Sequence, residues 1–442
     1  MTRTGKEGKC YNMMKRRQFI GSAAALTAAA FLPSSVWAGI KRGKIRTAHI
    51  GVGGQGASDL DSIASHPAVE VAALCDVDAT RLAAASKKHP GALTFSDYRV
   101  LFDKMGRKID AVIVSTPDHT HGPASLLALD MGKAVYCQKP LTRHVAEARR
   151  MSRMAGEKGL VTQMGIQIHS FKEYRSAVQL IQSGIIGKVS RVHAWSPKSW
   201  GYDGPPPEGS DPVPGDLDWN LWQGTAPERP YKKEIYHPVQ WRRILDYGGG
   251  ALGDMGAHIF DTPYMALAPD RPDTILAHCR EPNGFAHPEK NRVTYTFPGT
   301  RYTTESLTCK WYDGEGAPGE DPDLELPQGD KLPEQGAMFV GEKGRFLLPH
   351  WDFARLIVEG NYEKLDFPDL EEQDHYHQFI DACLGKGTSS TPFSYAAKLS
   401  EVVLLGVAAT HFPGTTLHLN REEGTFREEQ ANSLLDTGYR SF

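Results

Sequence analysis

Two short segments of the 442-residue chain carry side chains that could move a proton during a reaction. The first, residues 136–140 (YCQKP), closes an apolar run, and Pro140 keeps Lys139 out of any following helix. An ammonium group at such a turn can hydrogen-bond a substrate hydroxyl and stabilise an alkoxide while a hydride leaves. A solvated loop lysine is the alternative interpretation.

The second segment, residues 248–258 (GGGALGDMGAH), contains an acid and an imidazole four residues apart. This spacing places Asp254 and His258 on one face of a helix that begins after the triple glycine. Imidazole, with an unperturbed pKa of about 6.5, is suited to accept a hydroxyl proton, and a carboxylate can orient the imidazole or the substrate. A helix-surface pair or half of a metal site would also fit. No metal is predicted, because only two ligands are apparent.

A glycine-rich segment, residues 51–56 (GVGGQG), follows the apolar run 45–50, and the next apolar run ends at Asp76. This is the pattern of a dinucleotide site, in which the glycines allow a tight turn, a close approach to a pyrophosphate and close helix packing. The following helix would direct its N-terminus at the phosphates. A carboxylate at position 76 accepts hydrogen bonds from the ribose hydroxyls and repels a 2′-phosphate, so NAD is favoured over NADP. The predicted cofactor contacts here are Gly51, Gly53, Gly54, Gln55, Gly56 and Asp76.

The elements that position these residues follow from the alternation of apolar runs and helical stretches. Between residues 44 and 165, strands separated by helices predict a doubly wound, mostly parallel sheet, a Rossmann domain spanning 39–165. The candidate binding and catalytic residues of this domain fall just past strand ends, where ligands of such sheets bind. The predicted strands are 46–51, 69–76, 92–95, 111–115, 134–137 and 161–164.

Residues 166–442 have a different pattern of apolar and polar residues, which predicts a second, α+β domain. Alternating strands and long loops rich in Pro, Gly and Asp indicate an open, mostly antiparallel sheet, and residues 371–411 return to helical patterning. This domain would bind substrate and mediate oligomerisation. The fold class is therefore α/β with two domains, in keeping with the chain length.

Residues 1–38 resemble a twin-arginine export signal. A basic segment, KRRQFI at 15–20, precedes an apolar stretch that ends at Leu32, and residues 36–38 (VWA) offer small side chains for cleavage. The stretch is about 14 residues long, whereas a membrane span needs about 20, so no membrane anchor is predicted. The expected partner is the twin-arginine machinery and the expected location is periplasmic or otherwise exported. An ordinary secretory signal with a chance arginine pair is the alternative.

Charge and cysteine content exclude several classes of protein. The first 38 residues carry six basic side chains and one acid, so the rest of the chain has a net charge of −8 rather than −3. An acidic body without basic clusters argues against nucleic acid as a partner. The cysteines are scattered singly and predict no disulfide framework.

Over residues 44–410 the chain resembles the glucose-fructose oxidoreductase and inositol dehydrogenase family, Gfo/Idh/MocA. By this resemblance Lys139 and His258 are catalytic, Asp254 supports them, the substrate is a carbohydrate, and the chain forms a homo-oligomer. The family's usual glutamate before the lysine is here Gln138, which removes a carboxylate beside Lys139. The matching marks are the glycine pattern, Asp76, TPDHTH at 116–121, Gly132-Lys133, Lys139-Pro140 and Asp254-x-x-x-His258.

Further residues are predicted to contact the cofactor or the substrate. His119 and His121 could line the nicotinamide pocket, ligate a metal or cap the next helix. Indole and planar hydrogen-bonding groups suit the apolar face and hydroxyl rim of a sugar. The additional cofactor residues are Thr116, Pro117, His119, His121, Gln138 and Lys139. The substrate residues are Gln167, His237, Trp241, Arg242, Asp254 and His258, with Trp195, Trp200, Trp219 and Trp222 as further indoles.

Export and a dinucleotide site together predict a bound, recycled cofactor. Soluble NAD is not expected to be plentiful outside the cytoplasm, whereas the twin-arginine route carries folded proteins with cofactor in place. Either a second substrate returns the electrons, or the oxidised intermediate is reduced again after epimerisation or loss of a glycosidic group. The rival hypothesis is a non-catalytic sugar-binding protein that keeps a structural dinucleotide.

Overall fold

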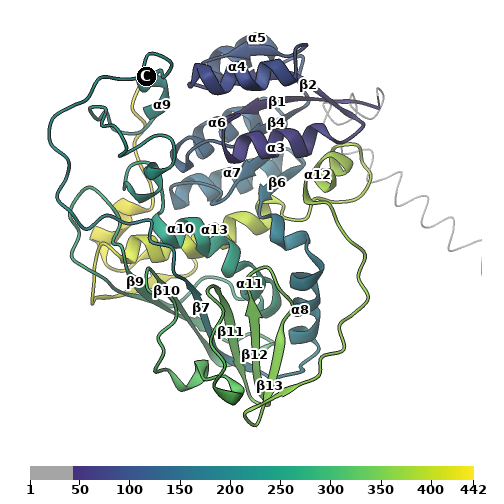
Figure 1. Cartoon of the computed structure of the whole chain (residues 1–442), viewed down its shortest axis with the longest axis vertical. Helices are drawn as coiled ribbons and strands as arrows, with labels where there is room; N and C mark the ends of the chain where they lie inside the picture. The colour runs from purple at the N-terminus through teal and green to yellow at the C-terminus, as the bar shows by residue number, and fades with distance from the viewer. Residues whose placement is uncertain (1–42) are drawn as a thin grey trace, which may run out of the picture.

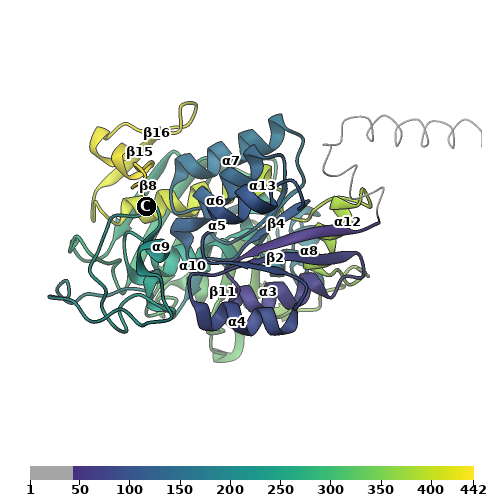
Figure 2. The same cartoon turned by 90° about the horizontal axis from the view of Figure 1, so that it is seen from above.

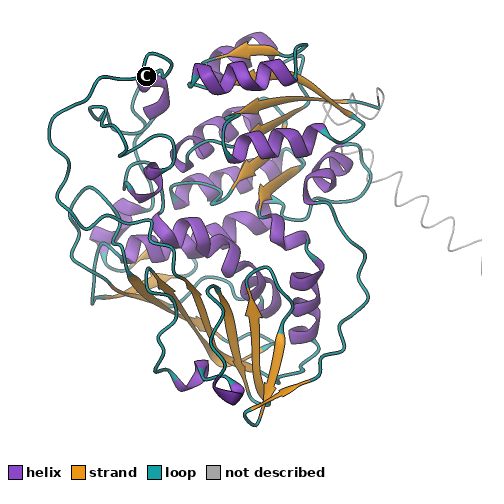
Figure 3. Cartoon of the chain, viewed as in Figure 1, coloured by secondary structure: helices purple, strands orange, loops and turns teal. Residues whose placement is uncertain are grey.

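The structure is a computed structural model that describes residues 43–442, so the predicted export signal lies outside the described residues. Figures 1 and 3 show a first sheet with its helices above a second, larger sheet. Among the described helices, none combines the length and the apolar character that a membrane span requires.

The first sheet has six strands in the order β3-β2-β1-β4-β5-β6, all paired in parallel. This is the strand order of the doubly wound dinucleotide-binding fold. Each predicted strand agrees with the observed one to within one residue at either end. The strands are β1 (Ile45–Ile50), β2 (Val69–Cys75), β3 (Leu93–Phe95), β4 (Ala111–Val114), β5 (Ala134–Gln138) and β6 (Thr162–Gly165).

Helices cover both faces of this sheet, as the view in Figure 2 shows. One face carries α5 (Tyr98–Met105), α6 (Asp118–Asp130) and α7 (Val145–Glu157), and the other carries α3 (Gln55–Ala64) and α4 (Ala79–Lys88).

A helix from the far end of the chain completes the second of these layers. Phe379 and Ile380 of α12 (His375–Cys383) pack in one apolar cluster with Ile45 and Ile113 of the first sheet. The division at residue 165 therefore separates the two sheets but not their helices.

The second sheet has ten strands in the order β14-β13-β12-β11-β7-β10-β9-β8-β15-β16. Its central β7 and β10 are parallel, and the other described pairings are antiparallel, as the sequence predicts. The strands are β7 (Val189–Ser196), β8 (Thr274–His278), β9 (Asn291–Pro298), β10 (Thr303–Asp313), β11 (Gly336–Gly341), β12 (Gly344–Pro349), β13 (Arg355–Val358), β14 (Asn361–Glu363), β15 (Thr416–Asn420) and β16 (Thr425–Phe426).

The alternation of side chains along β9 explains why this sheet is covered on one face. Val293, Tyr295 and Phe297 are buried, whereas Thr294 and Thr296 between them are partly exposed. A period of two turns every second side chain toward the helices. The remaining helices are α8 (Lys172–Gln182), α9 (Trp219–Gln223), α10 (Gly250–Ile259), α11 (Asp261–Leu267) and α13 (Phe393–Ala409), and the short 3-10 turns are η1 (Gln167–Ser170), η2 (Gln240–Arg243), η3 (Pro322–Leu324), η4 (Pro327–Gly329) and η5 (Glu429–Leu434).

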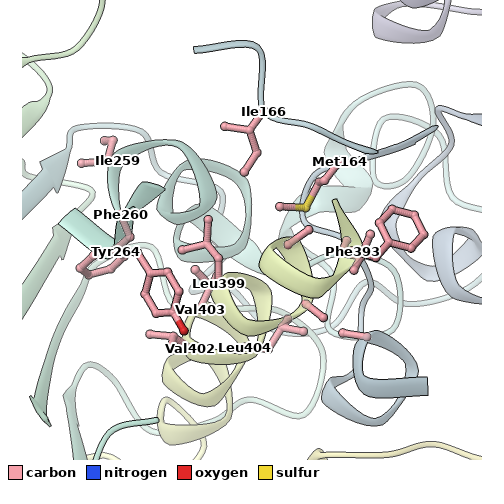
Figure 4. Packing of buried hydrophobic residues seen from close by; sticks show 14 of the residues in the cluster. Met164, Ile166, Ile259, Phe260, Tyr264, Phe393, Leu399, Val402, Val403 and Leu404 are labelled. Atoms are coloured by element: carbon pink, nitrogen blue, oxygen red, sulfur yellow. The ribbon is translucent and has the colours of Figure 1, made fainter. Parts of the chain in front are cut away.

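Helix α13 lies between the two sheets and is buried over most of its length. A helix that is apolar on nearly all sides must be covered on all sides. In Figure 4, Leu399 and Val403 of α13 lie among residues of β6, α10 and α11. The core is therefore continuous between the halves, and it fixes β6, α10 and the catalytic candidates relative to each other.

Candidate active site

A crevice of about 690 Å³ opens at the carboxyl ends of the strands of the first sheet. Its walls come from both halves of the molecule, and it brings most of the predicted residues together. Ligands of open α/β sheets bind at this edge. The predicted residues in its walls are Gly51, Gly53, Gly54, Gln55, Asp76, Thr116, Pro117, Gln138, Lys139, Gln167, His237, Trp241, Arg242, Asp254 and His258.

The glycine loop at one end of the crevice has the close contacts that its sequence implies. A Cβ atom on Gly51 would lie 2.5 Å from the Ser115 carbonyl oxygen, and one on Gly56 would lie 2.2 Å from the Gly51 carbonyl oxygen. Gly51 also has a φ of 82°, which favours glycine. Helix α3 begins directly after Gly54 without a side-chain cap, so its N-terminal N–H groups suit a pyrophosphate. The loop therefore fits a dinucleotide.

Asp76 lies at the end of β2, beside this loop. Its Oδ2 accepts from the Val52 N–H and its Oδ1 accepts from the Asp78 N–H, each at 2.9 Å. Burial raises the pKa of Asp76, while these two bonds act in the opposite direction. Each oxygen keeps a lone pair for a ribose hydroxyl. Nearby, Arg81 covers Gly53 and forms an ion pair with Asp78 at 3.2 Å, so a cation lies at the phosphate end.

The other end of the crevice contains the catalytic candidates. The Lys139 Nζ donates to Asp254 Oδ1 at 2.6 Å and to the Asp254 carbonyl at 2.8 Å. Trp200 Nε1 donates to the Asp254 Oδ2 at 2.8 Å, and Arg242 Nε donates to Oδ1 at 3.2 Å. Burial raises the pKa of Asp254, but Lys139 and Arg242 outweigh it and hold the pKa well below its ordinary value. Asp254 is thus an ionised anchor that fixes three donors around the substrate space.

His258 follows Asp254 by one turn of α10 and also lines the crevice. Burial lowers its pKa well below the usual value, and Lys139 and His350 act in the same direction. Its Nδ1 is buried without a hydrogen-bond partner in the described part of the chain. A neutral imidazole in this position can accept a proton.

A second imidazole, His350, lies at the same end, after strand β12. Its ring centroid is 6.1 Å from that of His258, and its Nδ1 lies 2.8 Å from the Tyr174 hydroxyl. Burial lowers the pKa of His350 to about 4, with Lys198 and Lys139 adding to the effect. Both imidazoles are therefore neutral near pH 7.

Asp118, at the start of α6, supplies a second carboxyl group to the crevice wall. Its Oδ2 accepts from the Gly249 N–H at 3.2 Å. Burial raises its pKa to about 7, although Arg242 and Lys139 act to lower it. Its charge therefore changes near neutral pH, unlike that of Asp254.

His119 and His121 do not line this crevice, which corrects the first of the three hypotheses about them. His119 is buried, with its Nε2 2.9 Å from the Trp222 carbonyl oxygen. His121 lies between the carbonyls of Pro140 and Thr116, at 2.8 and 2.9 Å. Burial lowers the pKa of His121, but Cys137 and the two carbonyls raise it overall. As a cation, His121 would donate to both loops and hold the turn at Lys139 in place.

A segment of the second domain forms a roof over the cofactor end of the crevice. We call residues 216–242 the roof. The Ala79 N–H donates to the Asp216 carbonyl at 2.8 Å, and the Asp218 N–H donates to the Val77 carbonyl at 3.0 Å. His237 Nε2 lies 3.1 Å from Asp78 Oδ2, and Leu221, Trp222 and Trp241 line the crevice from this side.

The last residues of the chain hold the roof from outside. The Arg440 guanidinium donates to the Ala226 carbonyl at 3.0 Å and to Asn220 Oδ1 at 2.8 Å. The Phe442 ring lies 3.8 Å from the Arg99 guanidinium carbon. The roof is therefore bonded to the first domain on two sides.

The sequence analysis missed several residues that line the crevice. Gln335 and His350 precede and follow the β11–β12 hairpin, and Tyr376 comes from α12; no local motif marks them. Trp200 and Trp222 line the crevice, whereas Trp195 and Trp219 lie outside its wall. The full set of missed wall residues with polar side chains is Arg81, Ser96, Tyr98, Ser115, Asp118, Thr120, Lys198, Gln335, His350 and Tyr376.

The binding edge of the six-stranded Rossmann sheet supplies a lysine, and the second domain that roofs it supplies a carboxylate and an imidazole. This is the architecture of a nicotinamide-dependent oxidoreductase. Two family models match the chain, both described as oxidoreductase family: the NAD-binding Rossmann fold over residues 45–166 and the C-terminal alpha/beta domain over residues 173–301. The chain belongs to the Gfo/Idh/MocA family.

Curated relatives match part of the chain. A glycosyl hydrolase family 109 protein from Stenotrophomonas maltophilia (strain K279a) is 28% identical over 194 residues, covering 41% of this chain and 42% of that protein. An inositol 2-dehydrogenase from Salmonella typhimurium (strain LT2) is 31% identical over 147 residues, covering 33% and 43%. The match thus spans less than half the length of these relatives.

Solved structures share the fold over most of the chain. The aldose-aldose oxidoreductase from Caulobacter crescentus, complexed with glycerol, superposes with a TM-score of 0.59 at 16% identity, covering 85% of this chain and 100% of that one. A levoglucosan dehydrogenase in complex with NADH and levoglucosan gives a TM-score of 0.59 at 15% identity, covering 85% and 99%. At these identities the likeness concerns the fold alone.

Proposed function

We propose that this protein is an exported oxidoreductase that oxidises a hydroxyl group of a sugar, polyol or glycoside and keeps its NAD bound between turnovers. The observation that carries the proposal is the contact of 2.6 Å between Lys139 Nζ and Asp254 Oδ1, in the same crevice as the glycine loop. When bound, NAD accepts a hydride from the carbon that carries the hydroxyl.

The side chains at the substrate end have complementary tasks in this reaction. Lys139 donates a hydrogen bond to the reacting hydroxyl and stabilises the alkoxide that develops on it. Neutral His258 accepts the hydroxyl proton, and Asp254 holds Lys139 in place. The indole of Trp200 and the stacked pair of Arg242 and Trp241, 4.3 Å from guanidinium carbon to ring centroid, suit the apolar face and hydroxyl rim of a sugar.

Retention of the cofactor is supported by the roof. The hydrogen bonds of Asp216 and Asp218 join the roof to residues 77 and 79, in the same segment as Asp76 and Arg81 of the crevice wall. A dinucleotide held under the roof would leave only when these bonds open, so dissociation should be slow.

Export is inferred from the sequence of residues 15–38 and agrees with a retained cofactor, because NAD would be loaded before the folded protein leaves the cytoplasm. The test is to purify the full chain without added nucleotide, denature it and identify the released nucleotide by mass and absorbance. Stoichiometric NAD or NADH is the expected result. Recovery of nucleotide-free protein that binds NAD weakly would contradict retention.

Turnover is tested separately, with a panel of sugars and glycosides. We expect NADH to appear on the enzyme in a single turnover and to be reoxidised by a second sugar or by the oxidised intermediate. Steady release of NADH into solution would contradict internal recycling. Absence of any reaction across the panel would favour a sugar-binding protein.

Redox-neutral cleavage of a glycoside is the second candidate function, favoured by the 28% identity to a glycosyl hydrolase family 109 protein. A transient ketone acidifies the neighbouring C–H bond, so that loss of this proton expels the glycosidic group. Water then adds to the unsaturated ketone, and the ketone is reduced again by the hydride first removed. Release of the aglycone from a chromogenic glycoside without net NADH formation would support this function over simple sugar oxidation.

A further inference from the structure

Asp59, on the second turn of α3, is a buried carboxylate that the proposed reaction does not use directly. Its Oδ1 accepts from Gln55 Nε2 at 2.8 Å and from the Tyr376 hydroxyl at 3.0 Å. Its Oδ2 accepts from the Ser115 hydroxyl at 2.6 Å and from Gln138 Nε2 at 2.8 Å. One carboxylate therefore joins the helix of the glycine loop, the ends of β4 and β5, and α12.

The charge of Asp59 is satisfied by neutral donors only. None of the ion pairs in the described part of the chain includes Asp59, and its side chain is fully buried. Burial raises its pKa, and the four donated hydrogen bonds act in the opposite direction. A buried carboxylate with four donors fixes the orientation of each donor, because any rotation leaves an unpaired charge.

For Gln138 this constraint reaches the catalytic turn. Because its Nε2 donates to Asp59, its Oε1 is available to the Lys139 N–H, at 3.3 Å. The amide occupies the space that a side chain at position 165 would fill, since a Cβ on Gly165 would lie 2.8 Å from it. Asp59 thus determines the orientation of the Gln138 amide, and this amide holds the backbone from which the Lys139 side chain extends.

By the resemblance given above, position 138 is also where a glutamate would be expected before the lysine. A glutamate there would meet Asp59 at the 2.8 Å that now separates Gln138 Nε2 from Oδ2. Two carboxylates at this distance cannot both be ionised. Gln138 and Asp59 together carry the single negative charge that one glutamate at position 138 would carry.

We propose that Asp59 is a positioning residue for Lys139, and that Asp59 and Gln138 form an exchanged pair in which the carboxylate lies on α3 instead of on the catalytic turn. The inference rests on the proposed function, because it concerns the lysine that acts in that reaction. It also links the turn to the substrate space, since Gln167 Nε2 donates to the Tyr376 hydroxyl at 3.2 Å.

The test is a charge-exchange cycle of Asp59→Asn, Gln138→Glu and the double variant in the full chain. The rate constant of NADH formation in a single turnover at saturating sugar is measured across about pH 5 to 9. We expect Asp59→Asn to lower this rate constant about 10-fold at every pH, with the sugar affinity unchanged. Gln138→Glu should lower it about 10-fold at high pH and recover as the pH falls, because a shared proton then removes the repulsion.

The double variant Asp59→Asn/Gln138→Glu is expected to return to within about 3-fold of the wild type. The matched control is Asp61→Asn on the same helix, an exposed residue paired with Lys88, which should behave like the wild type. A double variant no faster than the product of the two single effects would overturn the proposal, as would an unchanged rate in Asp59→Asn.

Thermal melting of the same four proteins separates this inference from the proposed function. If none of the sugars tested leads the wild type to reduce its NAD, the proposed function fails. Melting still measures the pairing of Asp59 with Gln138, because Gln138→Glu should melt at a lower temperature than the double variant. Equal melting temperatures would overturn the pairing. If Asp59→Asn does not fold, Gln138→Met removes the other partner of the same hydrogen bond and should show the same pH-independent loss of rate.

Discussion

The two ends of the crevice differ in how their residues are distributed along the chain. The cofactor end is formed by two short segments: the glycine loop 51–56, where Gly51 and Gly56 leave no room for a Cβ, and residues 75–78, which supply the Asp76 carboxylate. The substrate end consists of side chains from segments far apart in the chain, such as Lys139, Trp200 and His350. A backbone site requires particular residues at adjacent positions, so the local sequence encodes it. A side-chain site requires only that the fold bring its members together.

Lys139→Met should have the largest effect on the reaction rate, and it tests whether the substrate end can be changed without changing the cofactor end. Removing the ammonium should lower single-turnover NADH formation about 10³-fold, because the alkoxide loses its main stabilising charge. The nucleotide content of the purified protein should not change. Lys87→Met, on the exposed face of α4, is the control. Loss of nucleotide in Lys139→Met would show that the two ends are not separable.

The converse change is Gly56→Ala, where the new Cβ would lie 2.2 Å from the Gly51 carbonyl oxygen. We expect the loop to shift at a cost of about 2 kcal/mol and the bound nucleotide to fall by at least about 10-fold. Gly91→Ala is the matched control, since a Cβ there meets nothing within 4 Å. Full nucleotide occupancy in Gly56→Ala would contradict the backbone account of the cofactor end.

The substrate end should also depend on pH through Asp118, whose pKa burial raises to about 7. The folded state then holds a proton that the unfolded state loses at about pH 4, so this stabilisation is complete below about pH 4 and is lost as the pH rises to about 7. Asp118→Asn should therefore match the wild type in acid and be more stable by about 4 kcal/mol at pH 8.

Melting curves across this pH range measure the difference between Asp118→Asn and the wild type. Asp103→Asn, an exposed change on α5, should follow the wild type throughout. Parallel pH profiles for Asp118→Asn and the wild type would show that Asp118 has no raised pKa.

The smallest expected effect belongs to Trp200→Phe, which keeps an aromatic ring but removes the 2.8 Å hydrogen bond to Asp254 Oδ2. One such bond contributes about 1 kcal/mol, so NADH formation should slow about 5-fold without loss of nucleotide. Trp219→Phe removes an indole bond to the Arg229 carbonyl away from the crevice and should leave the rate constant unchanged. Equal rates in both variants would mean that Asp254 does not need this third donor.

The sequence predicts the first sheet and the cofactor end well because both have local signatures. Strand ends, the glycine loop and Asp76 follow from residues within about one supersecondary unit. Lys139, Asp254 and His258 lie in one crevice, as expected from short segments with a recognisable spacing. In contrast, His350 and Tyr376 reach the crevice only because β12 and α12 pack beside it, and no local sequence motif indicates them.

His119 and His121 illustrate a different limit of sequence reasoning. Residues two apart on a helix point in nearly opposite directions, so both imidazoles of α6 cannot face one pocket. In the structure His119 points to the Trp222 carbonyl and His121 to the carbonyls of Thr116 and Pro140. Because α6 begins at Asp118, both histidines lie within the helix and not before it, and their opposite directions follow from helical geometry.

Helix α13 joins both sheets through one apolar core, so neither half of the molecule can open without exposing the other. Val112 of the first sheet, Leu399 of α13 and Tyr295 of the second sheet belong to one buried cluster. The two halves should therefore unfold in a single cooperative calorimetric transition, and nucleotide bound to the first sheet should protect amides of the second from hydrogen exchange. Cavities made in α13, far from the crevice, would then shorten the lifetime of the loaded enzyme.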